Sequence, residues 1–240
     1  MSSNDMTVTQ APDPLPLLWL RRKIVVLSVY AWTFVGIAVT VVFYGVVRMA
    51  EPTLPPHRCL PYPARQLVVL SPIVALLLES YGERYGPRDA PEVQGLGFMF
   101  YIAHLSFSNA LIGVCMDPIE ILCSCCTVVF VCIPASFVRW KPDRFQVSKA
   151  IVDVFAIGCL VTNIVLRNVM DRNEATVPMF VVYTLSLASL ASAVSIILTD
   201  IERHVTPKQI KSQAIVFYCH LNLAYHSILI MWYAPWPLPN

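Results

Sequence analysis

The chain has 240 residues, of which 57% are hydrophobic and 13% are charged, and its formal net charge is +2. A soluble domain of this length carries about a quarter charged residues, so the composition favours a membrane protein. The small net charge, without a Lys/Arg block interleaved with aromatic residues, argues against nucleic acid as a partner.

The N-terminal 20 residues are polar and contain prolines, which predicts a disordered tail over residues 1–20. No secretory signal is expected, because the first apolar run, Ile24–Val47, is too long for the hydrophobic core of a signal peptide. Residues 21–240 are predicted to form one membrane domain.

Seven apolar segments, each bounded by charge, Pro or Gly, predict an all-α bundle of seven transmembrane helices. In chain order they are Ile24–Val47, Leu67–Leu78, Gly95–Met116, Ile119–Val138, Ala150–Leu166, Val177–Thr199 and Ala214–Trp232. The second is the weakest, because its apolar core is short and Pro72 interrupts it. It spans a bilayer only if residues 62–80 are recruited, or if neighbouring helices cover its freed backbone groups. Pro118 suits the first turn of the fourth helix.

The basic residues predict the orientation of these segments. Of the 17 lysines and arginines, 12 precede the first segment or lie between the second and third, fourth and fifth, and sixth and seventh segments. By the positive-inside rule, the N-terminus is cytosolic and the C-terminus lies on the far side.

Seven of the eight cysteines fall inside apolar segments, so we interpret them as packing residues and expect no disulfide framework. Cys123, Cys125 and Cys126 lack the paired spacing of a structural zinc site. We expect packing there, or palmitoylation if the cluster lies near the membrane interface. No bound metal is predicted.

Asp200, in the stretch SIILTDIERHV, follows a nearly uncharged run. A charge at the centre of a membrane helix costs about 2.5–3.5 kcal/mol and marks a candidate functional site. Alternatively, Asp200 pairs with Arg203 or His204, three and four residues further along, where the helix leaves the membrane. Both interpretations remain open.

The last segment contains His220, His226 and Ser227. Six residues separate the histidines, so their side chains point roughly 120° apart and cannot easily bind one metal. His104 offers a third ring, but nothing requires it. We expect hydrogen-bonded histidines and no enzyme, because a metal-dependent lipid hydrolase needs convergent ligands. No catalytic residue is named.

Ser186, Ser189 and Ser192 belong to a run of small residues that lets helices approach closely. We predict that this run makes the tightest helix contact and places Asp200 against other helices. Asp153, early in the fifth segment, is interpreted as a charge favoured by the helix N-terminus.

Three parts of the chain resemble the transmembrane BAX inhibitor motif family. They are residues 21–47, with a basic lead before the first span; residues 118–155, with the fourth span, a basic turn and the fifth span; and residues 195–205 with 223–232, in the last two spans. Seven spans with short loops look most like the divergent herpesviral branch, the cytomegalovirus seven-span proteins.

The resemblance implies a calcium-permeable leak closed by a pair of aspartates on the last two spans. Asp200 matches the first aspartate, and Ser227 stands where the second is expected. A lone carboxylate does not form a coupled pair, so His226 or His220 would have to supply any pH response. The expected function is a calcium leak, or viroporin, of host endomembranes that modulates calcium and cell death. The alternative is an immune-evasion adaptor that diverts host surface glycoproteins, such as natural killer cell ligands, without transport.

Overall fold

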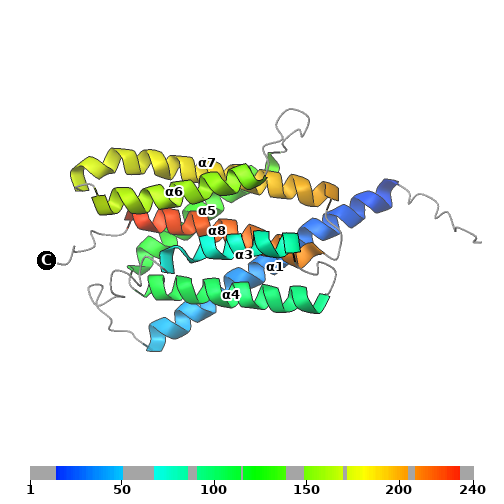
Figure 1. Cartoon of the computed structure of the whole chain (residues 1–240). Helices are drawn as coiled ribbons and strands as arrows, with labels where there is room; N and C mark the ends of the chain where they lie inside the picture. Colours follow the sequence, from blue (N-terminus) through cyan, green and yellow to red (C-terminus); the bar gives the residue numbers. More distant parts are fainter. Residues whose placement is uncertain are drawn as a thin grey trace, which may run out of the picture.

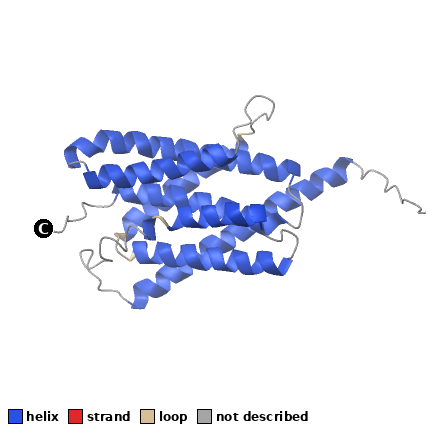
Figure 2. Ribbon diagram, viewed as in Figure 1, coloured by secondary structure: helices blue, strands red, loops and turns tan. Residues whose placement is uncertain are grey.

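The computed structural model describes residues 15–50, 68–85, 91–114, 116–138, 149–169, 172–204 and 209–232, and these form an all-helical bundle (Figure 2). Its helices are α1 Leu15–Ala50, α3 Ser71–Tyr85, α4 Pro91–Gly113, α5 Pro118–Phe137, α6 Lys149–Val169, α7 Arg172–His204 and α8 Ile210–Trp232. The predicted all-α class is confirmed, and each predicted segment overlaps one helix.

Four of these helices, α1, α4, α5 and α7, are long and apolar enough to cross a membrane by length and composition. The apolar part of α6, Ile151–Leu166, is shorter. Helix α3 has 15 residues and is about 22 Å long, less than the roughly 30 Å of a hydrocarbon core. The lengths and compositions indicate a membrane protein.

Two boundaries differ from the sequence-based expectation. Helix α1 begins at Leu15, so the predicted disordered tail is wrong for residues 15–20, and residues 1–14 lie outside the described part. Pro72 does not interrupt α3 but stands in its first turn, where the backbone N–H that proline lacks has no helical acceptor. Val68 and Val69 are helical too, and a turn at Leu70 separates them from α3.

The junction between α4 and α5 follows the prediction. Asp117 is the N-cap of α5, and its side chain accepts a hydrogen bond from the Ile119 N–H at 2.9 Å. Pro118 occupies the first turn, as expected.

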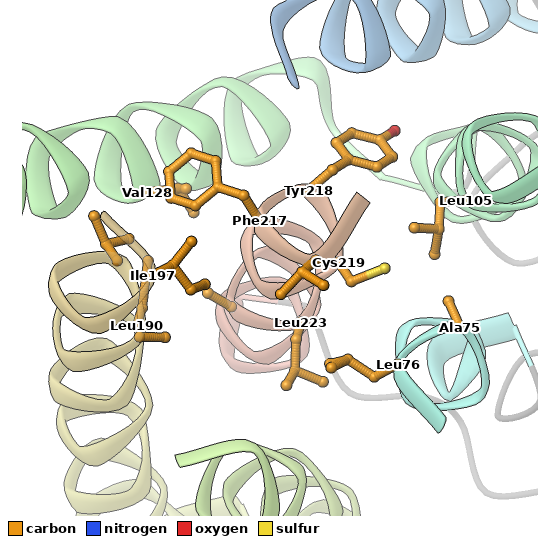
Figure 3. Packing of buried hydrophobic residues seen from close by; sticks show 14 of the residues in the cluster. Ala75, Leu76, Leu105, Val128, Leu190, Ile197, Phe217, Tyr218, Cys219 and Leu223 are labelled. Atoms are coloured by element: carbon orange, nitrogen blue, oxygen red, sulfur yellow. The ribbon is translucent and has the colours of Figure 1, made fainter. Parts of the chain in front are cut away.

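Helix α8 forms the centre of the bundle, because it packs against each of the other six helices (Figures 1 and 3). Every residue from 214 to 220 is buried. Around it, Leu190 and Ile197 of α7, Val128 of α5, Leu105 of α4 and Leu76 of α3 point inwards (Figure 3). A helix that is buried on all faces needs partners for its polar groups inside the protein.

The described cysteines differ in exposure, and Cys132 of α5 is partly buried. Cys159 and Cys219 are buried, as expected for packing residues. Cys123, Cys125 and Cys126 are exposed on α5, so the packing interpretation is wrong for them. The local sequence is apolar on both sides of α5, and only the neighbouring helices decide which side is buried. Cys59 and Cys115 lie outside the described residues.

We predict that Gly113→Ala destabilises the bundle. A Cβ atom at Gly113 would lie 2.9 Å from ring carbons of Tyr44, so the α1–α4 contact must shift. Such overpacking costs about 1–3 kcal/mol, measured as the free energy of unfolding in detergent. Gly45→Ala is the matched control, since a Cβ there meets nothing within 4 Å and alanine favours the helix. Equal stability of the two variants would contradict this packing.

Candidate functional site

One face of α8 places a histidine against a carboxylate of α6. The Nε2 atom of His220 lies 2.7 Å from Oδ1 of Asp153, and its Nδ1 atom lies 2.8 Å from the carbonyl of Val216. Both side chains are shielded, with exposed fractions of 2% and 13%. Because each ring nitrogen faces an acceptor, a ring protonated at both nitrogens satisfies both contacts and forms a salt bridge with Asp153.

A small cavity adjoins this pair, between α6, α7 and α8. Its volume is about 10 Å³, enough for one water molecule, and its lining includes Ser186, Ser189, His220 and Ser227. Ser186 and Ser227 donate hydrogen bonds to the carbonyls four residues earlier in their helices, at 2.9 Å each. Their oxygens can still accept. Ser189 Oγ is buried without a partner among the described residues. We call this place the serine cavity.

The opposite face of α8 carries a chain of amide and imidazole contacts. Asn222 Nδ2 donates to the carbonyl of Tyr218 at 2.8 Å, and Asn109 Nδ2 of α4 donates to Asn222 Oδ1. His226 Nε2 lies 2.8 Å from Asn109 Oδ1, and its Nδ1 lies 3.0 Å from the carbonyl of Val69. The chain links α4 and α8 to the segment that precedes α3.

The Tyr218 carbonyl sets the direction of this chain. It can only accept, so Asn222 presents its NH₂ group there and its oxygen to Asn109. Asn109 then presents its own oxygen to His226. As a result, His226 faces an acceptor at each ring nitrogen, and a neutral ring has one N–H for the two.

A third set of polar contacts joins α1, α4 and α8. Thr40 Oγ1 lies 2.9 Å from Ser106 Oγ, contacts the Tyr218 hydroxyl, and lies 3.0 Å from the Gly36 carbonyl. Three helices distant in sequence therefore share one hydroxyl cluster.

The structure does not bring Asp200 to these groups. Asp200 is exposed near the C-terminal end of α7, and its expected placement against other helices stays a prediction. Ser227 instead shares the serine cavity with Ser186, which lies 14 residues, or about 21 Å, before Asp200 on the same helix. Asp200 and Ser227 are therefore not neighbours in the structure. The side chains of Arg203 and His204 lie outside what the structure describes, and so does their predicted pairing with Asp200.

The predicted helix-packing serines differ in burial. Ser186 and Ser189 are buried, while Ser192 is partly exposed and donates to the Ala188 carbonyl at 2.8 Å. The rings of His220 and His226 face different helices, as their spacing predicts. His104 stacks on Phe100 of its own helix rather than meeting either ring.

The sequence interpretation missed the role of Asp153. It is the only charged residue of the apolar segment Ala150–Leu166. In the sequence, the nearby N-terminus of the helix was enough to explain this charge. The contact of Asp153 with His220 depends on packing between α6 and α8, which the local sequence does not show.

No family model, curated protein or solved structure matches this chain. Among the described residues, no group of three or more His, Cys, Asp or Glu side chains is placed to hold a metal ion.

We predict that Asn109→Leu lowers the free energy of unfolding by about 1–3 kcal/mol, because it strands His226 Nε2 and Asn222 Oδ1 without a partner. Asn163→Leu is the matched control, since Asn163 is fully buried on α6 and its amide has no partner within the described structure. That variant should be neutral or stabilising. The measurement is the free energy of unfolding of both variants in detergent. Equal decreases for Asn109→Leu and Asn163→Leu would contradict the hydrogen-bonded chain of Asn222, Asn109 and His226.

Proposed function

We propose that this protein crosses a host internal membrane seven times, with a cytosolic N-terminus, and acts as a calcium-permeable leak of the BAX inhibitor type. The distribution of basic residues supports the orientation, and the resemblance in three stretches of sequence supports the activity. The endoplasmic reticulum, the Golgi and a viral assembly compartment are the membranes in which a leak would modulate calcium and cell death.

The observation that carries this proposal is the shielded Asp153–His220 contact beside the serine cavity. Calcium prefers six to eight oxygen ligands. Asp153 supplies a carboxylate, and the hydroxyls of Ser186, Ser189 and Ser227 supply neutral oxygens nearby. So few ligands would hold calcium weakly, and weak binding suits a leak, because the ion must also leave.

The same contact acts as the closing element. His220 donates to Asp153 Oδ1, so a cation that approaches this carboxylate must displace the ring. Asp200, exposed and at the far end of α7, is not part of the path in this proposal. The passage therefore follows the α6–α7 side of α8.

The test is calcium entry into liposomes that contain the purified protein and an enclosed calcium-sensitive dye. Asp153→Asn should lower the flux several-fold, because it removes the negative charge of the path. His220→Leu should raise the flux, because it removes the donor that covers that charge. Asp200→Asn is the matched control and should leave the flux unchanged at equal reconstituted amounts.

A decrease with Asp200→Asn but not with Asp153→Asn would move the path away from the serine cavity. A flux equal to that of protein-free liposomes for the unmodified protein would exclude a leak altogether.

The exposed face of α5 favours a second candidate function, the immune-evasion adaptor. Phe130 and Phe137 are 78% and 81% exposed, which leaves bulky apolar side chains on the outside of the bundle for contact with membrane segments of host glycoproteins. The serine at position 227 also fits a protein that does not transport ions. Here Phe130→Ala with Phe137→Ala should restore host glycoproteins that the unmodified protein removes from the cell surface, measured by surface proteomics. If the unmodified protein changes the amount of no host glycoprotein at the cell surface, this result contradicts an adaptor.

A further inference from the structure

A long apolar groove lies between α1 and α5, with α8 as its floor. Its volume is about 610 Å³, within the range of sites that bind organic ligands. Phe34 and Val41 contribute to one wall, Val129 and Ile133 to the other. From the floor, Phe217 extends towards α5 (Figure 3).

The groove opens where the bundle meets the hydrocarbon of a membrane. Helices α1 and α5 have the apolar composition of membrane spans, and only 22% and 17% of their most apolar windows are buried. The wall residues Phe34, Val41 and Ile133 are 69%, 62% and 57% exposed. A ligand that enters between these walls comes from the lipid rather than from water.

The groove is long enough to hold an extended alkyl chain. Its lining on α1 runs from Tyr30 to Tyr44, 14 residues or about 21 Å. This length of the groove exceeds the thickness of one hydrocarbon leaflet, about 15 Å, so an acyl chain of one leaflet can lie in it over its whole extent.

The floor also favours hydrocarbon over a polar ligand. Most of the polar side chains that line the groove are already hydrogen-bonded within the protein. Thr33 and Ser136 donate to carbonyls of their own helices, and Thr40, Asn109, Tyr218 and Asn222 bond to one another or to His226. The remaining surface is aliphatic or aromatic for most of its length. A charged or strongly polar group in the groove would lose its hydration without a matching partner.

We propose that this groove is a binding site for one acyl chain of a membrane phospholipid. The chain lies along α8 between α1 and α5 and completes the packing of the central helix on this side. The site is separate from the serine cavity, which lies between α6, α7 and α8.

The test uses the full-length protein in phosphatidylcholine liposomes that contain a phosphatidylcholine with a photoactivatable group in its acyl chain. Mass spectrometry after illumination maps the cross-linked residues. We expect labelling of lining residues such as Val41 and Val129, and we expect excess unlabelled long-chain lipid to compete for it. Shorter-chain lipid should compete less, because it leaves part of the groove empty.

Adjacent residues provide matched variants. Val41 lines the groove and Val42 does not, although the two are 62% and 63% exposed. Val41→Trp should fill the groove and lower the labelling of α5 by about tenfold, a loss of about 1.4 kcal/mol of binding free energy, while Val42→Trp should leave it unchanged. Val129→Trp, with Phe130→Trp as its control, tests the opposite wall if Val41→Trp fails to fold.

Three results would overturn the proposal. The first is labelling of groove residues no stronger than labelling of the outward residue Val154 of α6, which is 70% exposed. The second is equal labelling of the groove in Val41→Trp and Val42→Trp, and likewise in Val129→Trp and Phe130→Trp. The third is a cross-linked dimer through Val41 and Val129, which would make a second copy of this chain the occupant.

Discussion

The central position of α8 among six helices is the constraint on which the rest of the structure depends. Six helices pack around it, and its polar residues Tyr218, His220, Asn222, His226 and Ser227 are buried, although the groove between α1 and α5 leaves one side of α8 less covered. Inside a membrane each of these polar groups needs a partner from the protein. Tyr218, His220, Asn222 and His226 find these partners on α1, α4, α6 and the segment before α3. The same contacts fix the rotation of α8 about its axis.

The two histidines of α8 show how differently a buried ring can be balanced. His220 faces a carboxylate and a carbonyl, so a second ring proton is offset by the charge of Asp153. His226 also faces two acceptors, but these are the neutral oxygens of Asn109 and Val69. A second proton there buries a charge beside neutral groups, and a single proton leaves one acceptor unpaired. His226 therefore lacks the charged partner that His220 has in Asp153.

The proposed leak and the proposed lipid site use opposite sides of the same helix. The ion path follows α6 and α7, where the oxygens of Asp153 and the serines gather. The groove follows α1 and α5, where the lining is apolar. An acyl chain that binds the folded bundle stabilises it by mass action. Since α8 contributes to both sites, lipid in the groove would also restrain the helix that carries His220.

The sequence by itself determined where the helices lie, because apolar run length, Pro118 and the charged boundaries are local properties. It also indicated that His220 and His226 face different ways, because helical spacing sets that angle. It did not determine which side of each helix is buried, as Asp200, Asp153 and Cys125 show. Asp153 lies inside an apolar segment and Asp200 directly follows one, yet neither position shows from the sequence that Asp153 meets His220 and that Asp200 is exposed. Only tertiary structure decided between them, because the inward face of a helix depends on neighbours that are remote in the chain.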